Sequence, residues 1–168
     1  MKHFTFISNS PKSTLSFAKK LASLLQKQDI LVLSGDLGAG KTKFTEGILS
    51  FFNLENEISS PTFTIVNEYD TPSTPIFHFD VYRLEDSSEF YEIGGEEYFQ
   101  QGICLIEWGE LVEDALPKDY LKICFSKDAF LENKRILSFY AYGDRYENLL
   151  NELSALDKRK DCDLFWNY

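Results

Sequence analysis

The amino-acid sequence predicts a single α/β domain of the P-loop NTPase type. In this three-layer sandwich, helices cover both faces of a central, mostly parallel sheet with an antiparallel portion. The strongest observation is the octapeptide GDLGAGKT at 35–42, which has the pattern G-x-x-x-x-G-K-T. Its flanks agree, because the apolar run ILVL at 30–33 suits a buried strand and apolar residues recur at helical spacing after Thr42. A length of 168 residues, 43% of them hydrophobic, suits one domain with its own core.

The first third of the chain predicts two strand–helix units. Residues 4–7 form a first strand, and Ser13 or Thr14 caps the helix that follows. The strand at 30–33 then leads into the glycine-rich loop. The helix after this loop carries four apolar residues on one side: Phe44, Ile48, Phe51 and Phe52.

The middle of the chain predicts a hairpin followed by a helical segment. Residues 64–69 (TIVNEY) and 76–84 (IFHFDVYRL) alternate between apolar and polar as strands do. The turn-rich DTPSTP at 70–75 is short enough for a hairpin loop. Residues 86–101 are acidic and are expected to be mostly helical, with an interruption at Gly94-Gly95.

The last third predicts a buried strand at 103–106 (ICLI), a short helix closed by Pro117, and a second hairpin from 120–125 and 135–142. An amphipathic helix at 145–156 follows.

We therefore expect a P-loop ATPase domain over residues 1–143. Residues 144–168 comprise this final helix and a tail with three aromatics in its last four positions. The tail either folds back onto the body of the protein or docks on a partner, so this segment is part of the same domain or a docking element.

The octapeptide predicts a nucleotide site with a definite chemistry. Glycines let successive main-chain N–H groups point at phosphate oxygens, and the N-terminus of the following helix adds its positive dipole end. Lys41 reaches the β- and γ-phosphates, and the Thr42 hydroxyl ligates Mg²⁺. The predicted nucleotide-binding set is Gly35, Asp36, Leu37, Gly38, Ala39, Gly40, Lys41, Thr42, Lys43, Trp108 and Arg135.

Hydrolysis also needs a carboxylate at the end of a neighbouring strand, and two candidates fit. Glu107 ends the run ICLI, and Asp80 lies in the strand 76–84. Either acid can hold the magnesium ion or orient the attacking water, so the catalytic set is Glu107, Asp80 and Lys41 and the metal set is Thr42, Glu107 and Asp80. His78 is interpreted as a partner of Asp80. Trp108 lies either beside the nucleotide or in the core.

The segment Ser60-Pro61-Thr62 is a candidate switch in which Thr62 senses the γ-phosphate, with an ordinary turn as the alternative.

Composition narrows the class of protein. The net charge of −10 argues against a solitary nucleic-acid binder, because such proteins bind phosphates through Lys and Arg. The three cysteines, Cys104, Cys124 and Cys162, lack metal-ligand spacing and indicate reduced thiols. No signal peptide or membrane-length apolar run is visible, so we expect a cytoplasmic protein without a membrane partner.

Other P-loop classes fit less well. A GTPase would need Asn-Lys-x-Asp, whereas Asn133-Lys134 is followed by Arg135 and Ile136. A small-molecule kinase clamps its substrates with several arginines close to the site. This chain has only four arginines, and only Arg83 is close in sequence to a candidate site element. A small ATPase without its own acceptor site remains. The small-molecule kinase and a nucleotide-gated binding module stay as alternatives.

Four blocks in order carry a family resemblance: GDLGAGKT (35–42), SPTFTIVNEY (60–69), HFDVYRL (78–84) and ICLIEW (103–108). Together they resemble the TsaE (YjeE) family, and the similarity extends to about residue 143. The resemblance implies an ATPase that binds ATP and Mg²⁺ and associates with TsaB and TsaD. In this system TsaD transfers the threonylcarbamoyl group to the adenosine next to the anticodon of tRNAs that read ANN codons, and the ATPase turns the complex over. The chain would contact tRNA indirectly and would not bind DNA.

The resemblance also implies roles for individual residues. Lys41 matches the phosphate lysine and Thr42 the magnesium hydroxyl. Asp80 matches the acid of the HFD block, and Glu107 and Trp108 match the Walker-B-like acid and the tryptophan on the nucleotide side. Thr62 matches the switch threonine, and Arg135 matches a basic residue near the nucleotide. Lys43 occupies a position where a second threonine is common in the family. With few arginines available, we expect slow hydrolysis without partners.

Overall fold

The computed structural model describes residues 1–58 and 64–163. The predicted switch residue Thr62 and the aromatic residues of the tail, 165–168, lie outside the described residues. The strands are β1 (Lys2–Ser8), β2 (Ile30–Ser34), β3 (Val66–Tyr69), β4 (Ile76–Asp80), β5 (Ile103–Glu107), β6 (Tyr120–Lys127) and β7 (Arg135–Tyr142). The helices are α1 (Pro11–Ala22), α2 (Lys41–Phe51), α3 (Ser87–Glu92) and α4 (Asp144–Asp163), with 3₁₀ helices η1 (Gly95–Gln100) and η2 (Gly109–Ala115).

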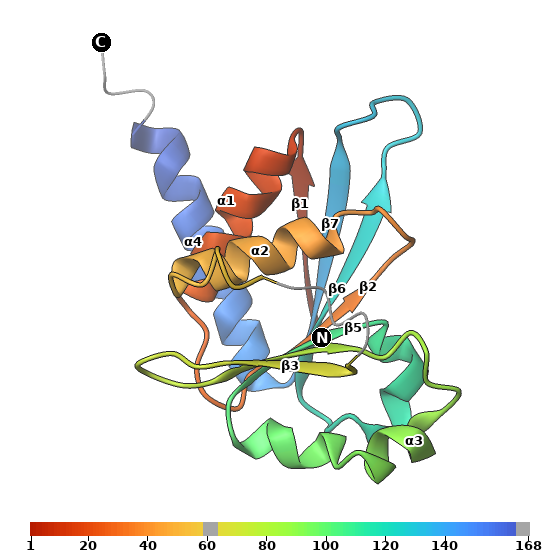
Figure 1. Ribbon diagram of the computed structural model, residues 1–168. Helices are drawn as coiled ribbons and strands as arrows, with labels where there is room; N and C mark the ends of the chain where they lie inside the picture. The colour runs from red at the N-terminus through yellow and green to blue at the C-terminus, as the bar shows by residue number, and fades with distance from the viewer. Residues whose placement is uncertain (59–63, 164–168) are drawn as a thin grey trace.

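Within the described residues, seven strands form one mixed sheet in the order β1-β7-β6-β2-β5-β4-β3. Strands β4, β5, β2 and β6 run parallel. The outer strands β3, β7 and β1 pair antiparallel with their neighbours. The predicted α/β fold with a mostly parallel centre and an antiparallel portion is confirmed. Because parallel strands end at the same edge, the carboxyl ends of β2, β5 and β4 meet around the glycine-rich loop (Figure 1).

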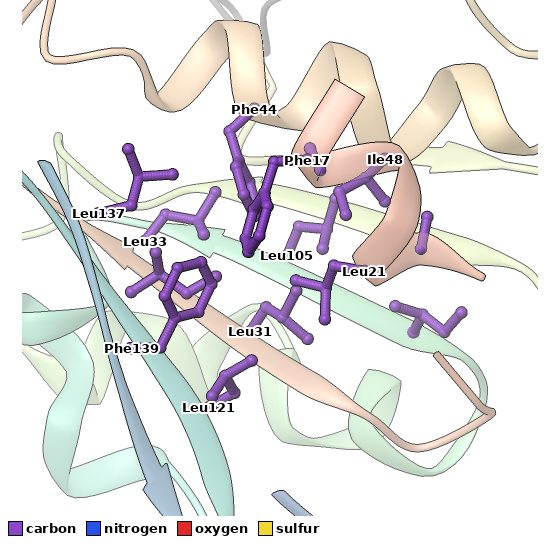
Figure 2. Close-up of a cluster of buried hydrophobic side chains, with 14 of the residues drawn as sticks. Phe17, Leu21, Leu31, Leu33, Phe44, Ile48, Leu105, Leu121, Leu137 and Phe139 are labelled. Carbon is purple, nitrogen blue, oxygen red and sulfur yellow. The ribbon is translucent and has the colours of Figure 1, made fainter. Parts of the chain in front are cut away.

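Helices cover both faces of the sheet, so the molecule has three layers (Figure 1). One core lies beneath α1, α2 and α4 and is lined by alternate strand residues such as Leu31 and Leu33. Figure 2 shows Phe17 and Phe44 packed over these strand leucines together with Phe139. The second core lies beneath α3, η1 and η2. It uses the opposite strand faces, through Ile30, Val32, Phe79, Cys104 and Ile106.

Several predicted element ends were wrong for local reasons. Ser10, and neither Ser13 nor Thr14, caps α1: its side chain accepts the Ser13 N–H at 3.1 Å, and a proline takes the first helical position. The strand predicted over 76–84 ends at Asp80, because the Asp80 carboxylate accepts the Tyr82 N–H at 3.1 Å and turns the chain.

Two further predictions were wrong in part. The final helix is longer than the predicted 145–156, and Phe51 of α2 is 39% exposed rather than packed beside Phe44 and Ile48.

Helix α4 is anchored to the rest of the fold at its first turn. The Tyr146 hydroxyl accepts the Ile30 N–H at 2.8 Å, at the start of β2. Arg145 donates from Nε and Nη2 to the two carboxylate oxygens of Asp29, at 3.0 and 2.6 Å. Further along α4, three leucines are buried in the same core as α1 and β7: Leu149, Leu150 and Leu153. No described helix has both the length and the apolar character needed to cross a membrane.

The Arg145–Asp29 pair gives a stability prediction. Asp29 is 3% exposed, so Arg145→Ala leaves a buried carboxylate without its bidentate partner and is expected to cost about 3 kcal/mol of unfolding free energy. Lys20→Ala is the matched control, because it removes the less buried Lys20–Asp157 pair and is expected to cost less than about 1 kcal/mol. Urea denaturation of both variants checks the difference. Equal losses would mean that the Asp29 carboxylate finds another partner.

Candidate functional site

The glycine-rich loop connects β2 to α2 and is shaped by three glycines with positive φ: Gly35 at 145°, Gly38 at 74° and Gly40 at 110°. Gly35 is the most constrained of them. A Cβ atom there would lie 2.5 Å from the Phe125 carbonyl oxygen on β6. Any larger residue would therefore force the loop away from the sheet. The strand–loop–helix context predicted for the motif is present.

Lys41 is held inside this loop. It is 7% exposed, and its Nζ donates to the Gly35 carbonyl oxygen and, at 3.3 Å, to that of Asp36. Burial lowers the pKa of Lys41 below its ordinary value, although the carboxylates of Glu107 and three other acids oppose this shift. The ammonium group thus lies in a partly dehydrated site, where its attraction for a phosphate is stronger than at the surface.

The two predicted acids end neighbouring strands. Asp80 ends β4 and Glu107 ends β5, and the parallel register pairs them directly. Glu107 is 7% exposed, and its Oε1 has no hydrogen-bond partner among the described residues. A buried carboxylate oxygen without a partner is costly and indicates a missing ligand or water.

His78 contacts a different acid from the one predicted. Its Nε2 lies 3.7 Å from Glu107 Oε1, and among the described residues His78 makes no hydrogen bond or ion pair with Asp80. The reason is the strand pairing, which brings β5 alongside β4. Both His78 ring nitrogens are buried and also lack hydrogen-bond partners in the described part of the chain.

Trp108 packs against the core and also lines the cavity beside the glycine-rich loop. Its ring packs against the core under α3, and the Lys41 Nζ lies 4.0 Å from its centroid, a cation–π contact. The Tyr82 ring lies 4.9 Å away on the solvent side. Trp108 has a φ of 62°, and its N–H donates to the Leu33 carbonyl at 3.0 Å, which fixes the turn that directs its ring toward the loop.

A cavity of about 340 Å³ opens at this point. Most of the predicted site residues line it: Leu37, Gly38, Gly40, Lys41, Thr42, Lys43, Asp80, Glu107 and Trp108, joined by Glu46. Asp36 and Ala39 belong to the loop but do not line the cavity. Ala39 is instead buried in the core. The Lys43 side chain forms an ion pair, because its Nζ lies 2.6 Å from a carboxylate oxygen of Glu46.

The residues fit a magnesium nucleotide better than a metal alone. Among the described residues, no group of three or more His, Cys, Asp or Glu side chains could hold a metal ion. Mg²⁺ is commonly bound by one or two carboxylates together with substrate phosphates and water. Asp80, Glu107 and the Thr42 hydroxyl supply such a partial set, and the unpartnered Glu107 oxygen is suited to it.

Two basic residues lie at the other edge of the loop. A Cβ atom on Gly40 would lie 3.8 Å from Cγ of Arg135, whose Nη1 donates to the carbonyls of Glu132 and Lys134 at 2.6 and 3.0 Å. Arg135 therefore braces the loop without lining the cavity. Lys127 lies against Gly38, and no motif in the sequence marks it. The signal was weak: a lone lysine just after a predicted strand whose neighbours in the sheet were unknown.

The contact between Gly35 and β6 gives a second stability prediction. Gly35→Ala places a methyl group against a strand carbonyl that cannot yield, at a φ that L-residues avoid, and is expected to cost about 3 kcal/mol. Gly94→Ala is the control. It also has a positive φ, but its Cβ would meet only the Glu97 side chain at 3.5 Å, so a loss of about 1 kcal/mol is expected. Chemical denaturation measures both. Equal losses of unfolding free energy in the two variants would show that the close approach of Gly35 to β6 adds nothing to the cost of the substitution.

Comparison with known proteins agrees with this geometry. A family model described as "Threonylcarbamoyl adenosine biosynthesis protein TsaE" matches residues 8–136. Two curated relatives carry the name tRNA threonylcarbamoyladenosine biosynthesis protein TsaE. The one from Bacillus subtilis is 42% identical over 158 residues, covering 94% of this chain and 98% of the relative. The one from Rickettsia conorii is 37% identical over 158 residues, covering 94% and 87%.

A solved structure is similar as well. The crystal structure of Bacillus subtilis YdiB superimposes with a TM-score of 0.77 and 38% identity, covering 93% of this chain and 97% of that one. The similarity thus extends over most of the fold as well as the sequence blocks around the loop. This chain belongs to the TsaE family.

Proposed function

We propose that this protein is a Mg²⁺-dependent ATPase of tRNA threonylcarbamoyladenosine biosynthesis, acting with TsaB and TsaD to turn their complex over. Membership of the TsaE family supports the pathway. The observation that carries the ATPase activity is the convergence of Lys41, Asp80 and Glu107 on one cavity beside the glycine-rich loop. This combination of a cation, two carboxylates and main-chain amides suits phosphoryl transfer from a nucleoside triphosphate.

Each residue has a separate task in this proposal. The loop amides and Lys41 bind the phosphates and neutralise the charge that builds up on them. Lys41 exchanges its contacts with the Gly35 and Asp36 carbonyls for phosphate oxygens. A bound Mg²⁺ supplies further charge neutralisation, with Thr42 and the carboxylates as its protein ligands. One carboxylate, Glu107 or Asp80, orients the attacking water.

The disposition of the arginines supports dependence on a partner. Arg145 is paired with Asp29, and Arg135 donates to carbonyls of its own hairpin. Arg83 is exposed and is not among the residues that line the cavity. Within the described side chains, therefore, no arginine lines the cavity in which the transition state would form. A group supplied by another protein could raise the rate by about 10³–10⁵.

Charge distribution supports an indirect contact with tRNA. Residues 85–114 contain ten acidic residues and no lysine or arginine, which equals the net charge of the whole chain. Apart from β5, which belongs to the sheet, this segment forms α3, η1 and η2 on one face of the sheet. An acidic layer repels a phosphate backbone, so the partner proteins, rather than this face, would hold the tRNA.

Lys41→Met tests nucleotide binding. Loss of the ammonium group is expected to weaken Mg-ATP binding at least about 100-fold, because charge-assisted hydrogen bonds to phosphate are lost. Isothermal titration calorimetry measures the affinity for Mg-ATP, because its signal does not depend on the Lys41 side chain. Lys118→Met is the matched control and should bind normally, since Lys118 is exposed and does not line the cavity. Unchanged affinity in Lys41→Met would remove this lysine from the site.

Glu107→Gln tests hydrolysis. The variant should bind Mg-ATP but lose about 100-fold in turnover, because an amide orients water poorly. Glu96→Gln is the control: Glu96 is exposed on η1, does not line the cavity and should leave the activity unchanged. Turnover is measured with and without TsaB and TsaD. Equal turnover in the two conditions would contradict dependence on partners. Full tRNA modification by an inactive Glu107→Gln variant would favour a nucleotide-gated binding module.

A further inference from the structure

Lys127 is a cation placed against the glycine-rich loop without a counter-charge. It is the last residue of β6, and its Nζ lies 3.3 Å from the position of a Cβ atom on Gly38. Across the described residues, the Lys127 ammonium has no hydrogen-bond or ion-pair partner. Neighbouring lysines differ, because Lys43 pairs with Glu46 and Lys134 with Asp128 at 2.9 Å. In a protein with a net charge of −10, an unpaired lysine beside a phosphate loop is available for a ligand.

The sheet topology indicates which part of the ligand Lys127 faces. Strand β2, which leads into the loop, has β5 on one side and β6 on the other (Figure 1). Glu107 at the end of β5 and Asp80 beyond it mark the side where the reacting γ-phosphate lies. Lys127 ends β6 on the opposite side, about 10 Å across the sheet from β5. The nucleoside and the γ-phosphate are the two ends of a nucleoside triphosphate, so with the γ-phosphate beside these acids the nucleoside end would extend toward β6.

The β6–β7 hairpin fixes Lys127 in this position. Lys127 pairs with Arg135 in the antiparallel register, at the point where the loop of the hairpin begins. Arg135 lies against Gly40, and its Nη1 is committed to carbonyls of the hairpin loop. Asp128 accepts N–H groups from Phe130 and Leu131 and further orders this loop. The ammonium of Lys127 is therefore presented by a braced element at the edge of the site.

We propose that Lys127 is a nucleoside-binding residue whose ammonium donates to ribose oxygens of the bound nucleotide. It adds affinity for the nucleoside half of the ligand and takes no part in cleavage of the γ-phosphate. This inference rests on the proposed function, because it assumes that the loop binds a nucleoside triphosphate.

Calorimetry with three probes tests this assignment: Mg-ATP, Mg-ADP and Mg-tripolyphosphate, which lacks the nucleoside. Lys127→Met is expected to weaken ATP and ADP binding by the same factor, about tenfold, and to leave tripolyphosphate binding unchanged. Lys41→Met should weaken all three. Lys118→Met is the matched control for the loss of one charge, because Lys118 is exposed and lies at the opposite edge of the sheet, before β6 begins.

Each other result overturns the assignment. Equal losses for ATP and tripolyphosphate would make Lys127 a phosphate ligand or a support of the loop. A larger loss for ATP than for ADP would place it at the γ-phosphate, and unchanged binding of all three probes would leave it without a role. Failure of the native protein to bind either ATP or tripolyphosphate would instead refute the proposed function itself. Binding of tripolyphosphate as tightly as ATP by the native protein would show that the nucleoside is not recognised.

Discussion

The close approach of the glycine-rich loop to β6 is the constraint on which the rest of the site depends. Gly35 is the position where this loop leaves β2, and a Cβ atom there would collide with the Phe125 carbonyl oxygen. This contact holds the loop against the sheet edge and sets the start of α2. The same edge carries the ends of β4 and β5, so one packing contact positions the loop, Lys41 and both acids relative to one another.

The site also contains charged groups that have weak hydrogen-bond partners or none. Lys41 donates to carbonyls of its own loop and lies over the Trp108 ring, while one oxygen of Glu107 has no described partner. Full internal pairing of these groups would make the protein more stable. Natural proteins therefore keep such unpaired groups mainly where function requires them. A cation that must leave weak local acceptors binds an incoming phosphate at a lower cost than one held in a strong ion pair.

The features that could be predicted from the sequence are those encoded within a few neighbouring residues. The loop and its flanking strand and helix are contiguous, and Glu107 follows an unmistakable apolar run. The ends of helices were harder to predict, because neighbouring residues compete for the capping position. At α1, Ser10 and Ser13 are both plausible caps, and Pro11 decides between them. The contact of His78 with Glu107 and the position of Lys127 depend on which strands are neighbours. Strand order arises from pairing between distant segments, which no local pattern records.

The place of β1 in the sheet has a consequence for synthesis on the ribosome. Residues Lys2–Ser8 pair with Arg135–Tyr142, so more than a hundred residues separate β1 from its sheet partner along the sequence. Until that partner is translated, an apolar segment with open main-chain groups remains exposed, as aggregation-prone edges do. Addition of β1 to the sheet is therefore a long-range event that cannot occur before β7 has been made.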